Sequence, residues 1–192
     1  MNVLIIYAHP NPRSFNQAIL ETVDATLRER GHATRIHDLY QMQFRAVLDG
    51  EDLLRNWRGD LAPDTRREQD AVQWAQGLVV IYPIWWFGPP AILKGWIDRV
   101  FTRKFAFDFG PDGMKGLLTH ERALILNTLG GDEATYQQER WHELLVRPMA
   151  EGVLGACGVR NVVHRAFYQV PSVSHAERQA MLGEVRALAT AF

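Results

Sequence analysis

Short apolar runs alternate with amphipathic segments from one end of the chain to the other. Some of the runs are apolar on both faces, most clearly VLIIYA after Asn2 and LVVI from Leu78. Runs of this kind are typical of parallel strands that lie between layers of helices. The pattern predicts five strands, at Asn2–Ala8, Thr34–Leu39, Leu78–Ile81, Arg122–Asn127 and Asn161–Ala166.

The segments between these runs carry apolar residues at helical spacing. Ser14 is a candidate N-cap for a helix that ends at Gly31, and Ser174 with Glu177 forms a capping box for the last helix. Other helices are predicted at 64–76, at 92–100 and from 132 to about 157, where Pro148 is a candidate break. The alternation predicts an α/β fold in one domain, 1–192, arranged as a three-layer sandwich around a five-stranded parallel sheet.

Two segments do not follow the alternation. Tyr40–Asp64 mixes polar and apolar residues with weak periodicity. It is too long for a loop that only connects two elements. We expect it to lie over a ligand site or to pack on a second subunit. Phe105–Leu118 is an aromatic, glycine-containing excursion that follows the helix ending near Val100.

The central strand leads into an unusual loop. Pro83 ends the strand, and Trp85, Trp86 and Phe87 follow where a surface loop is normally polar. No charge occurs from Gly77 to Leu93, but the prolines and glycine in this stretch make it a poor bilayer span. Aromatic rings at the carboxyl end of a central strand suit a flat heteroaromatic ligand. The alternative is that the three rings fill the core.

Composition narrows the class of protein. Hydrophobic residues make up 47% and charged residues 22% of the 192 residues, as in ordinary globular proteins. The net charge of −1 does not indicate a nucleic-acid partner. Cys157 is the only cysteine, which excludes an internal disulfide framework and suits the reducing cytoplasm. The spacing of the histidines does not indicate a metal site, and Cys157 lies in an apolar segment typical of the core.

The carboxyl ends of parallel strands meet at one sheet edge, so three distant loops should converge there: 9–16, 83–87, and 128–131 with the residues that follow. The first loop ends at a helix N-terminus, which favours a phosphate, and Arg13 and His9 are candidates to add charge. This segment is neither a glycine-rich nucleotide fingerprint nor a P-loop, and the alternative is a solvated Arg13 beside a simple cap.

The third loop combines two adjacent glycines, Gly130 and Gly131, with Tyr136 and His142 further on. Adjacent glycines let backbone amides approach a flat ligand closely. Tyrosine and histidine can donate hydrogen bonds to an atom that gains negative charge. By spacing alone, these two side chains can equally be structural residues.

Four segments together resemble a known family. They are YAHPNPRSFN from Tyr7, WFGPPAILKGWIDRVF from Trp86, KFAFDF from Lys104, and TLGG from Thr128 with the tyrosine and histidine that follow it. The chain is similar in these segments to the NAD(P)H:quinone oxidoreductases of the DT-diaphorase type. These are flavodoxin-like flavoproteins, and the family includes the ancillary oxidoreductases of bacterial potassium-efflux systems.

The resemblance implies a role for each matching residue. The flavin's phosphates, and its adenosine part in FAD, would be held by His9, Arg13, Ser14, Phe15, Asn16 and Ala18. The isoalloxazine would be enclosed by Pro83, Ile84, Trp85, Trp86, Phe87, Thr128, Leu129, Gly130 and Gly131. Tyr136 and His142 match the pair that stabilises charge on the reduced ring. Phe107 and Phe109 match substrate positions where relatives often have tyrosine, so hydrogen bonding to the acceptor is in doubt there.

The activity that the resemblance implies is ping-pong hydride transfer from NAD(P)H through the flavin to a quinone or a related acceptor. It also implies a homodimer with shared sites, to which 105–109 and the loop around Trp57 are candidate contributors. The alternatives are a flavin-binding regulatory subunit of a cation-efflux transporter, a flavodoxin-like electron carrier, or an azo- or nitroreductase on the same scaffold. FAD is favoured by the SFN segment, whereas the short chain allows FMN, and the sequence does not distinguish NADH from NADPH.

Overall fold

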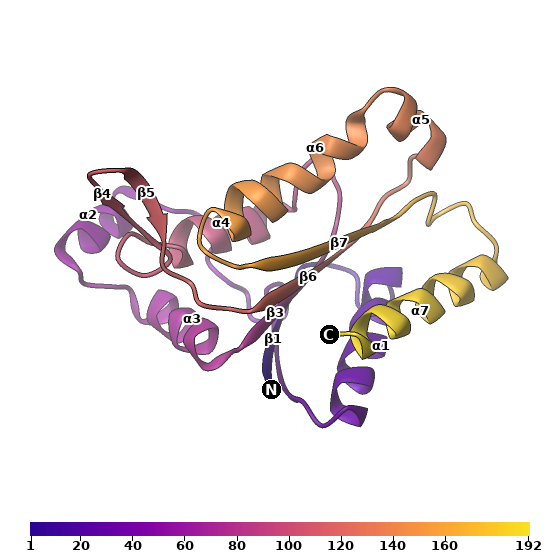
Figure 1. Ribbon diagram of the computed structural model, residues 1–192, viewed down its shortest axis with the longest axis horizontal. Helices are drawn as coiled ribbons and strands as arrows, with labels where there is room; N and C mark the ends of the chain where they lie inside the picture. Colours follow the sequence, from indigo (N-terminus) through magenta and orange to yellow (C-terminus); the bar gives the residue numbers. More distant parts are fainter.

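The computed structural model describes residues 1–192 and is built around a parallel sheet (Figure 1). The strand order is β2-β1-β3-β6-β7. These strands are β1 (Asn2–Tyr7), β2 (Ala33–Asp38), β3 (Gly77–Pro83), β6 (Arg122–Thr128) and β7 (Asn161–Phe167). The five predicted strands are therefore confirmed, with small shifts at their ends.

Helices cover both faces of the sheet, as Figure 1 shows. One face carries α1 (Phe15–Glu29) and α7 (His175–Thr190). The other carries α3 (Pro63–Trp74), α4 (Ala91–Val100), α6 (Trp141–Arg147) and η1 (Pro148–Gly155), with the short α5 (Glu133–Gln138) before α6. The predicted α/β three-layer sandwich of the flavodoxin-like type is confirmed.

Alternation along the buried strands creates two separate cores. In β1, Val3 and Ile5 face the side of α1 and α7, while Leu4 and Ile6 face the side of α3 and α4. All four side chains are at most 1% exposed. Successive strand residues point to opposite faces, so a run that is apolar at every position must be covered on both.

Helix α2 (Gly50–Arg58) was not predicted. Its end signals are clear, with a capping box between Asp49 and Asp52 and a left-handed Gly59 at its C-cap. However, Asp52 is its only buried residue. The helix therefore lacks the core-facing apolar stripe on which a prediction from hydrophobic periodicity depends.

Two other segments are more regular than expected. The helical backbone continues through Pro148, with φ −60° and ψ −45°, so the chain does not leave the helical conformation at the candidate break. The α-helical bonding pattern does end at Arg147, and a wider π-helical pattern begins at Pro148, which has no N–H to donate to the preceding turn. The aromatic excursion forms an antiparallel hairpin of β4 (Phe107–Gly110) and β5 (Gly113–Gly116).

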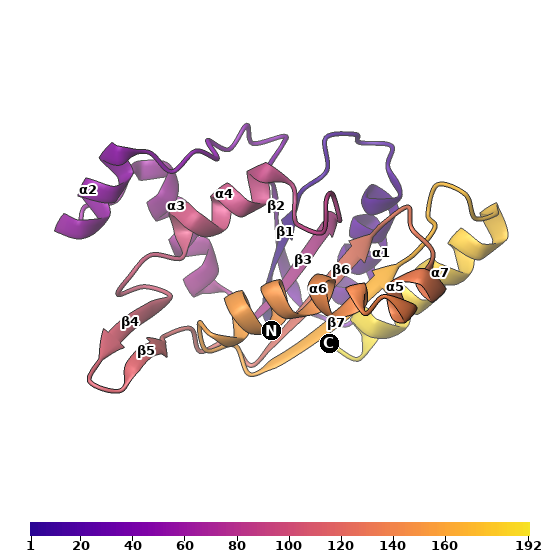
Figure 2. The same cartoon turned by 90° about the horizontal axis from the view of Figure 1, so that it is seen from above.

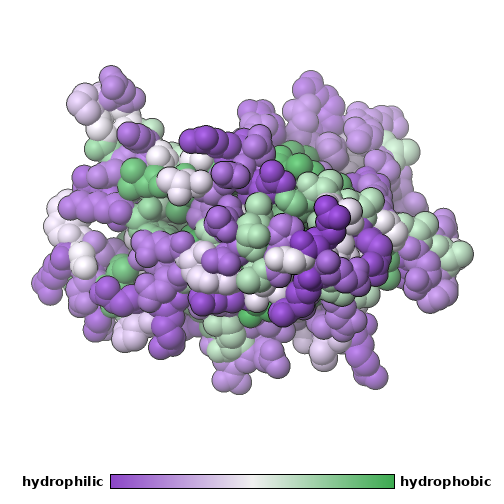
Figure 3. All heavy atoms as spheres, turned by 60° about the horizontal axis from the view of Figure 1, so that its bottom comes forward, coloured by the Kyte–Doolittle hydropathy of each residue, from purple (hydrophilic) through white to green (hydrophobic).

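The molecular surface is mostly hydrophilic on the side drawn in Figure 3, with apolar residues in scattered patches. None of the helices is both long and apolar enough to cross a membrane.

Candidate active site

The sheet register places the predicted loops at one edge. Pro83 of β3 lies beside Thr128 of β6, and Thr128 lies beside Phe167 of β7. Tyr7 of β1 lies beside Ile81, close to the same level. The segments that follow these strands therefore leave the sheet together, at the upper edge in Figure 2. The expected convergence of the first three loops is confirmed, and the segment after β7 joins them.

The first loop forms the N-terminus of α1. The Ser14 side chain accepts a hydrogen bond from the backbone N–H of Gln17, which is the predicted cap. The N–H groups of Phe15 and Asn16 donate to no acceptor of the chain. Together with the positive end of the helix dipole, these groups suit an anionic ligand. Ala18 lies one turn further on and is half-buried.

Arg13 and His9 flank this helix end. The Arg13 side chain is exposed. Burial lowers the pKa of His9, so its ring is neutral at pH 7 and adds no charge. Its Nδ1 accepts from the N–H of Asn11 at 3.0 Å, so the proton is on Nε2, and its ring lies 6.1 Å from that of Trp85. His9 therefore contributes a neutral donor between the first and second loops.

Asn16 links the first loop to the third. It is 2% exposed, and its Nδ2 donates to Thr128 Oγ1 at 2.6 Å. Its Oδ1 is buried and has no hydrogen-bond partner. A buried acceptor without a donor is costly. The arrangement fits a ligand that supplies a donor at this point.

The aromatic loop is a tight turn with its rings outside the core. The N–H and carbonyl groups of Trp85 and Gly88 pair reciprocally at 3.0 Å. Between them, Trp86 and Phe87 adopt left-handed φ values of 50° and 62°. Trp85, Trp86 and Phe87 are 44, 98 and 39% exposed, which excludes core filling as the explanation for them. By contrast, Pro83 and Ile84 are buried at the base of the turn.

The third loop presents backbone donors. The N–H groups of Gly130 and Gly131 donate to no acceptor of the chain. The Thr128 and Leu129 side chains are buried, so Leu129 can face a ligand only through its backbone. A Cβ atom at Gly131 would lie 2.5 Å from the Tyr136 ring, so glycine here also makes room for that ring.

Tyr136 and His142 lie in one aromatic cluster with the second loop. The Tyr136 ring is 5.9 Å from Phe87 and 5.6 Å from Trp141. His142 Nδ1 lies 2.6 Å from the hydroxyl oxygen of Tyr168, whose ring also contacts Tyr136 at 5.6 Å. The structure thus places Tyr136 beside the aromatic turn, and Tyr168 joins His142 to Tyr136.

Tyr168 was missed by the sequence reasoning. It follows β7 directly, at the same edge as the other loops, and it is 6% exposed. Its position after the fifth predicted strand was the available signal, because every strand of a parallel sheet contributes a loop to this edge.

Phe107 and Phe109 are not brought to this edge within one chain. Both lie in β4, with ring centroids 5.7 Å apart, and Phe109 is 60% exposed. Figures 1 and 2 both show the β4–β5 hairpin at the opposite end of the molecule from α5.

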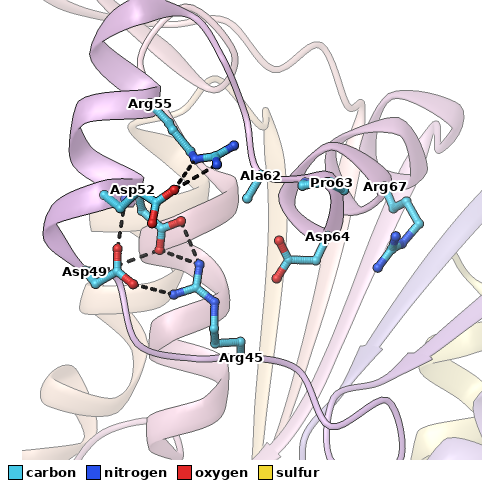
Figure 4. Close-up of a pocket in the computed structure, with 9 residues that line it drawn as sticks. Arg45, Asp49, Asp52, Arg55, Ala62, Pro63, Asp64 and Arg67 are labelled. Carbon is cyan, nitrogen blue, oxygen red and sulfur yellow. Dashed lines mark hydrogen bonds and ion pairs between the residues drawn. The ribbon is translucent and has the colours of Figure 1, made fainter.

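A cavity of about 540 Å³ lies elsewhere, between α2 and α3 (Figure 4). Its walls are charged and largely paired with one another. Arg45 contacts Asp49 at 2.8 Å and Asp52 at 2.7 Å, and Arg55 contacts Glu51 at 2.8 Å. Since it offers little apolar surface to a flat ring, the candidate active site is the sheet edge.

Comparison with known proteins agrees with this fold. A family model described as the flavodoxin-like fold matches residues 1–189. The chain therefore belongs to the flavodoxin-like fold family. Within it, the chain is 33% identical over 183 residues to an uncharacterized NAD(P)H oxidoreductase of Haemophilus influenzae, covering 95% of this chain and 91% of the relative.

Solved structures extend the comparison. The NAD(P)H:quinone oxidoreductase of Methanothermobacter marburgensis superposes with a TM-score of 0.90 at 31% identity, covering 99% of this chain and 96% of that one. An FMN-dependent NADH-azoreductase of Bacillus anthracis, solved in complex with FMN, shares the fold at 18% identity with a TM-score of 0.79, covering 98% of this chain and 97% of that one. The family resemblance predicted from the sequence is confirmed.

Proposed function

We propose that this protein is a flavin-dependent NAD(P)H dehydrogenase that reduces quinones or related acceptors. The observation that carries the proposal is the sheet edge, where unpaired backbone N–H groups of the first and third loops accompany the exposed aromatic rings of the second. The relatives described as NAD(P)H and quinone oxidoreductases support the same activity. When bound, a flavin supplies the two-electron chemistry, taking a hydride from NAD(P)H and passing it to the acceptor in a second half-reaction.

The residues present fit such a cofactor. The free N–H groups of Phe15 and Asn16 would hold its phosphate. The exposed Arg13 side chain would pair with the phosphate charge. Trp85, Trp86 and Phe87 would cover its ring system, and the donors of Gly130 and Gly131 would meet its polar edge. We propose FAD, with FMN as the alternative, because the segment Ser14–Asn16 resembles that of FAD-binding relatives.

Tyr136 and His142 would stabilise the negative charge that a bound flavin ring gains on reduction. Tyr136 lies beside Phe87 and the glycine loop, where a bound ring would gain negative charge during reduction, and His142 is joined to Tyr136 through Tyr168. Donors fixed in place before the reaction stabilise such charge without reorganising. We therefore assign charge stabilisation to this pair, and ring placement to the aromatic turn.

We further propose a homodimer with shared sites in a cytoplasmic setting. Helix α2 exposes Leu53 and Leu54 at 57 and 59%, and Trp57 at 85%. An exposed apolar face of this kind marks a protein–protein contact. The hairpin with Phe107 and Phe109 is remote from its own site, and a second copy could place these rings over the acceptor.

The deciding experiment uses the purified protein. Its chromophore is released and identified by mass, and the flavin absorbance is followed anaerobically after NADH or NADPH and then a benzoquinone are added. Bleaching followed by recovery is the expected result. Bound flavin that neither nucleotide reduces would overturn the proposed activity and favour a regulatory subunit of a transporter. Absence of any flavin would overturn the cofactor assignment.

The double substitution Tyr136→Phe with His142→Ala tests the assigned pair. We expect flavin content to be retained and flavin reduction to slow by about 10-fold to 1000-fold, because two donors to the developing charge are lost. Stopped-flow reduction by NAD(P)H is the measurement, with the exposed His175→Ala as the control. Unchanged kinetics in the double variant would remove both residues from the mechanism.

A further inference from the structure

Tyr168 is the only side chain that contacts both members of the proposed catalytic pair among the interactions described above. Its hydroxyl oxygen lies 2.6 Å from His142 Nδ1, and its ring meets the Tyr136 ring at 5.6 Å and 67°. The side chain is buried, and its hydroxyl group has no other hydrogen-bond partner. It is therefore placed to control how both side chains face the sheet edge.

The direction of this hydrogen bond follows from the groups around it. Burial raises the pKa of Tyr168, so the phenol keeps its proton at neutral pH. A buried O–H group with a single available partner must donate to that partner to be satisfied. The hydroxyl thus donates to His142 Nδ1, which leaves Nε2 as the ring nitrogen that carries the proton.

A second half-buried histidine lies beside His142. The His164 ring is 6.3 Å from the His142 ring, and His164 Nε2 contacts Asn127 Oδ1 at 2.5 Å. Asn127 Nδ2 donates to the carbonyl of Tyr82 at 3.3 Å, so Oδ1 is an acceptor and His164 Nε2 is a donor. Burial lowers the pKa of His164 to about 4, so its ring is neutral at neutral pH, and its hydrogen bond goes to Asn127 and not to Tyr168.

We propose that Tyr168 is a positioning residue that fixes His142 in the Nε2–H tautomer and supports the Tyr136 ring from behind. The inference rests on the proposed function for what His142 then does, namely donate from Nε2 to the charge that develops on the bound ring. The tautomer itself is a property of the folded chain and does not depend on turnover.

The tautomer is tested directly by 15N NMR of histidine side chains in the purified protein, with His142→Gln identifying the signal. We expect wild-type His142 to show a protonated Nε2 and an unprotonated Nδ1, and Tyr168→Phe to give a mixture of tautomers. Tyr40→Phe is the matched control, because Tyr40 is half-buried and follows β2, which lies at the opposite side of the sheet from β7. A protonated Nδ1 in the wild type, or an unchanged His142 signal in Tyr168→Phe, would overturn the inference.

Kinetics test the consequence. Tyr168→Phe keeps the ring, so flavin content should be unchanged while flavin reduction slows by about 3-fold to 10-fold, the range expected when one neutral hydrogen bond is lost. The double variant Tyr168→Phe with His142→Ala should be no slower than His142→Ala alone, because Tyr168 acts through His142. Additive losses would contradict this coupling. If the wild type is not reduced at all, the proposed function fails, while the NMR result still decides the positioning role.

Discussion

Arg99 of α4 is the largest fully buried side chain of the protein, and two carboxylates compensate its charge. Its guanidinium contacts Asp52 at 3.1 Å and Asp64 at 2.6 Å. It also donates to the carbonyl of Arg45 at 2.8 Å. A buried charge must be paired in this way to be tolerated. As a result, α2 is anchored by its acidic side, and its apolar side is left facing outward.

His164 permits a prediction, also at the scale of one residue, about how the free energy of unfolding depends on pH. Burial, with smaller contributions from His142 and Arg165, lowers the pKa of His164 to about 4. The unfolded chain then binds a proton that the folded protein does not, between about pH 6.5 and about pH 4. The free energy of unfolding should therefore fall as the solution is acidified through this window.

The variant His164→Gln isolates this contribution. Its free energy of unfolding should fall by about 2 kcal/mol less than that of the wild type between about pH 7 and about pH 4.5. Urea unfolding at the two pH values, followed by circular dichroism, provides the measurement. Equal losses in both proteins would show that His164 titrates normally in the folded state.

At the scale of elements, the turn from Trp85 to Gly88 combines strain with exposure. Two consecutive residues other than glycine, Trp86 and Phe87, have left-handed backbone conformations. Each costs on the order of 1 kcal/mol in a side-chain-bearing residue. The turn thus holds aromatic rings outside the core at the expense of stability, which is expected where the rings serve a ligand.

Substitution of Trp86 separates the two effects. Trp86→Gly should raise the free energy of unfolding by about 1 kcal/mol, because glycine adopts this conformation readily and the 98% exposed ring loses no packing. The same variant should bind flavin more weakly. Trp86→Ala is the control: it loses the ring but keeps the strain, so it should weaken flavin binding without stabilising the fold. Denaturant titration and flavin titration measure both quantities, and tighter flavin binding in either variant would contradict the assigned role.

At the scale of the whole molecule, the apolar face of α2 and the side chains of Phe109 and Met114 in the β4–β5 hairpin are exposed within one chain. Gly95 lets the segment before α2 approach α4 closely, since a Cβ there would lie 1.9 Å from the carbonyl oxygen of Ala46. The segment is therefore held firmly against the body of the protein. This rigid display of apolar side chains supports the proposed homodimer.

The dimer is tested by placing a charge on this face. Trp57→Glu should convert a dimer into a monomer with little change in the free energy of unfolding of each chain, because the ring is 85% exposed. Light scattering coupled to size exclusion gives the mass. Ala176→Glu, which adds the same charge on exposed α7, should remain dimeric. A wild-type monomer, or a Trp57→Glu dimer, would contradict the proposal for this face.

Much of the fold could be predicted because the spacing of apolar residues along the chain indicates which positions are buried. The doubly apolar strands β1, β3 and β6, the caps at Ser14 and Ser174 and the aromatic turn after Pro83 each depend on neighbouring residues. The meeting of the loops at one edge then follows from the parallel direction of the strands. Helix α2 escaped prediction because its buried position is an aspartate, which hydrophobic periodicity does not register.

The sequence by itself determined the sheet, its covering helices and the edge at which three loops meet, because these follow from periodicity and chain direction. Only the tertiary structure decided which atoms face one another at that edge. The contact of Tyr168 with His142, the link from Asn16 to Thr128 and the neutral His9 arise from strand register and burial, which no local pattern encodes. The physical reason is that hydrophobic burial is largely non-directional, whereas a hydrogen bond requires two atoms within a few tenths of an ångström of a set distance.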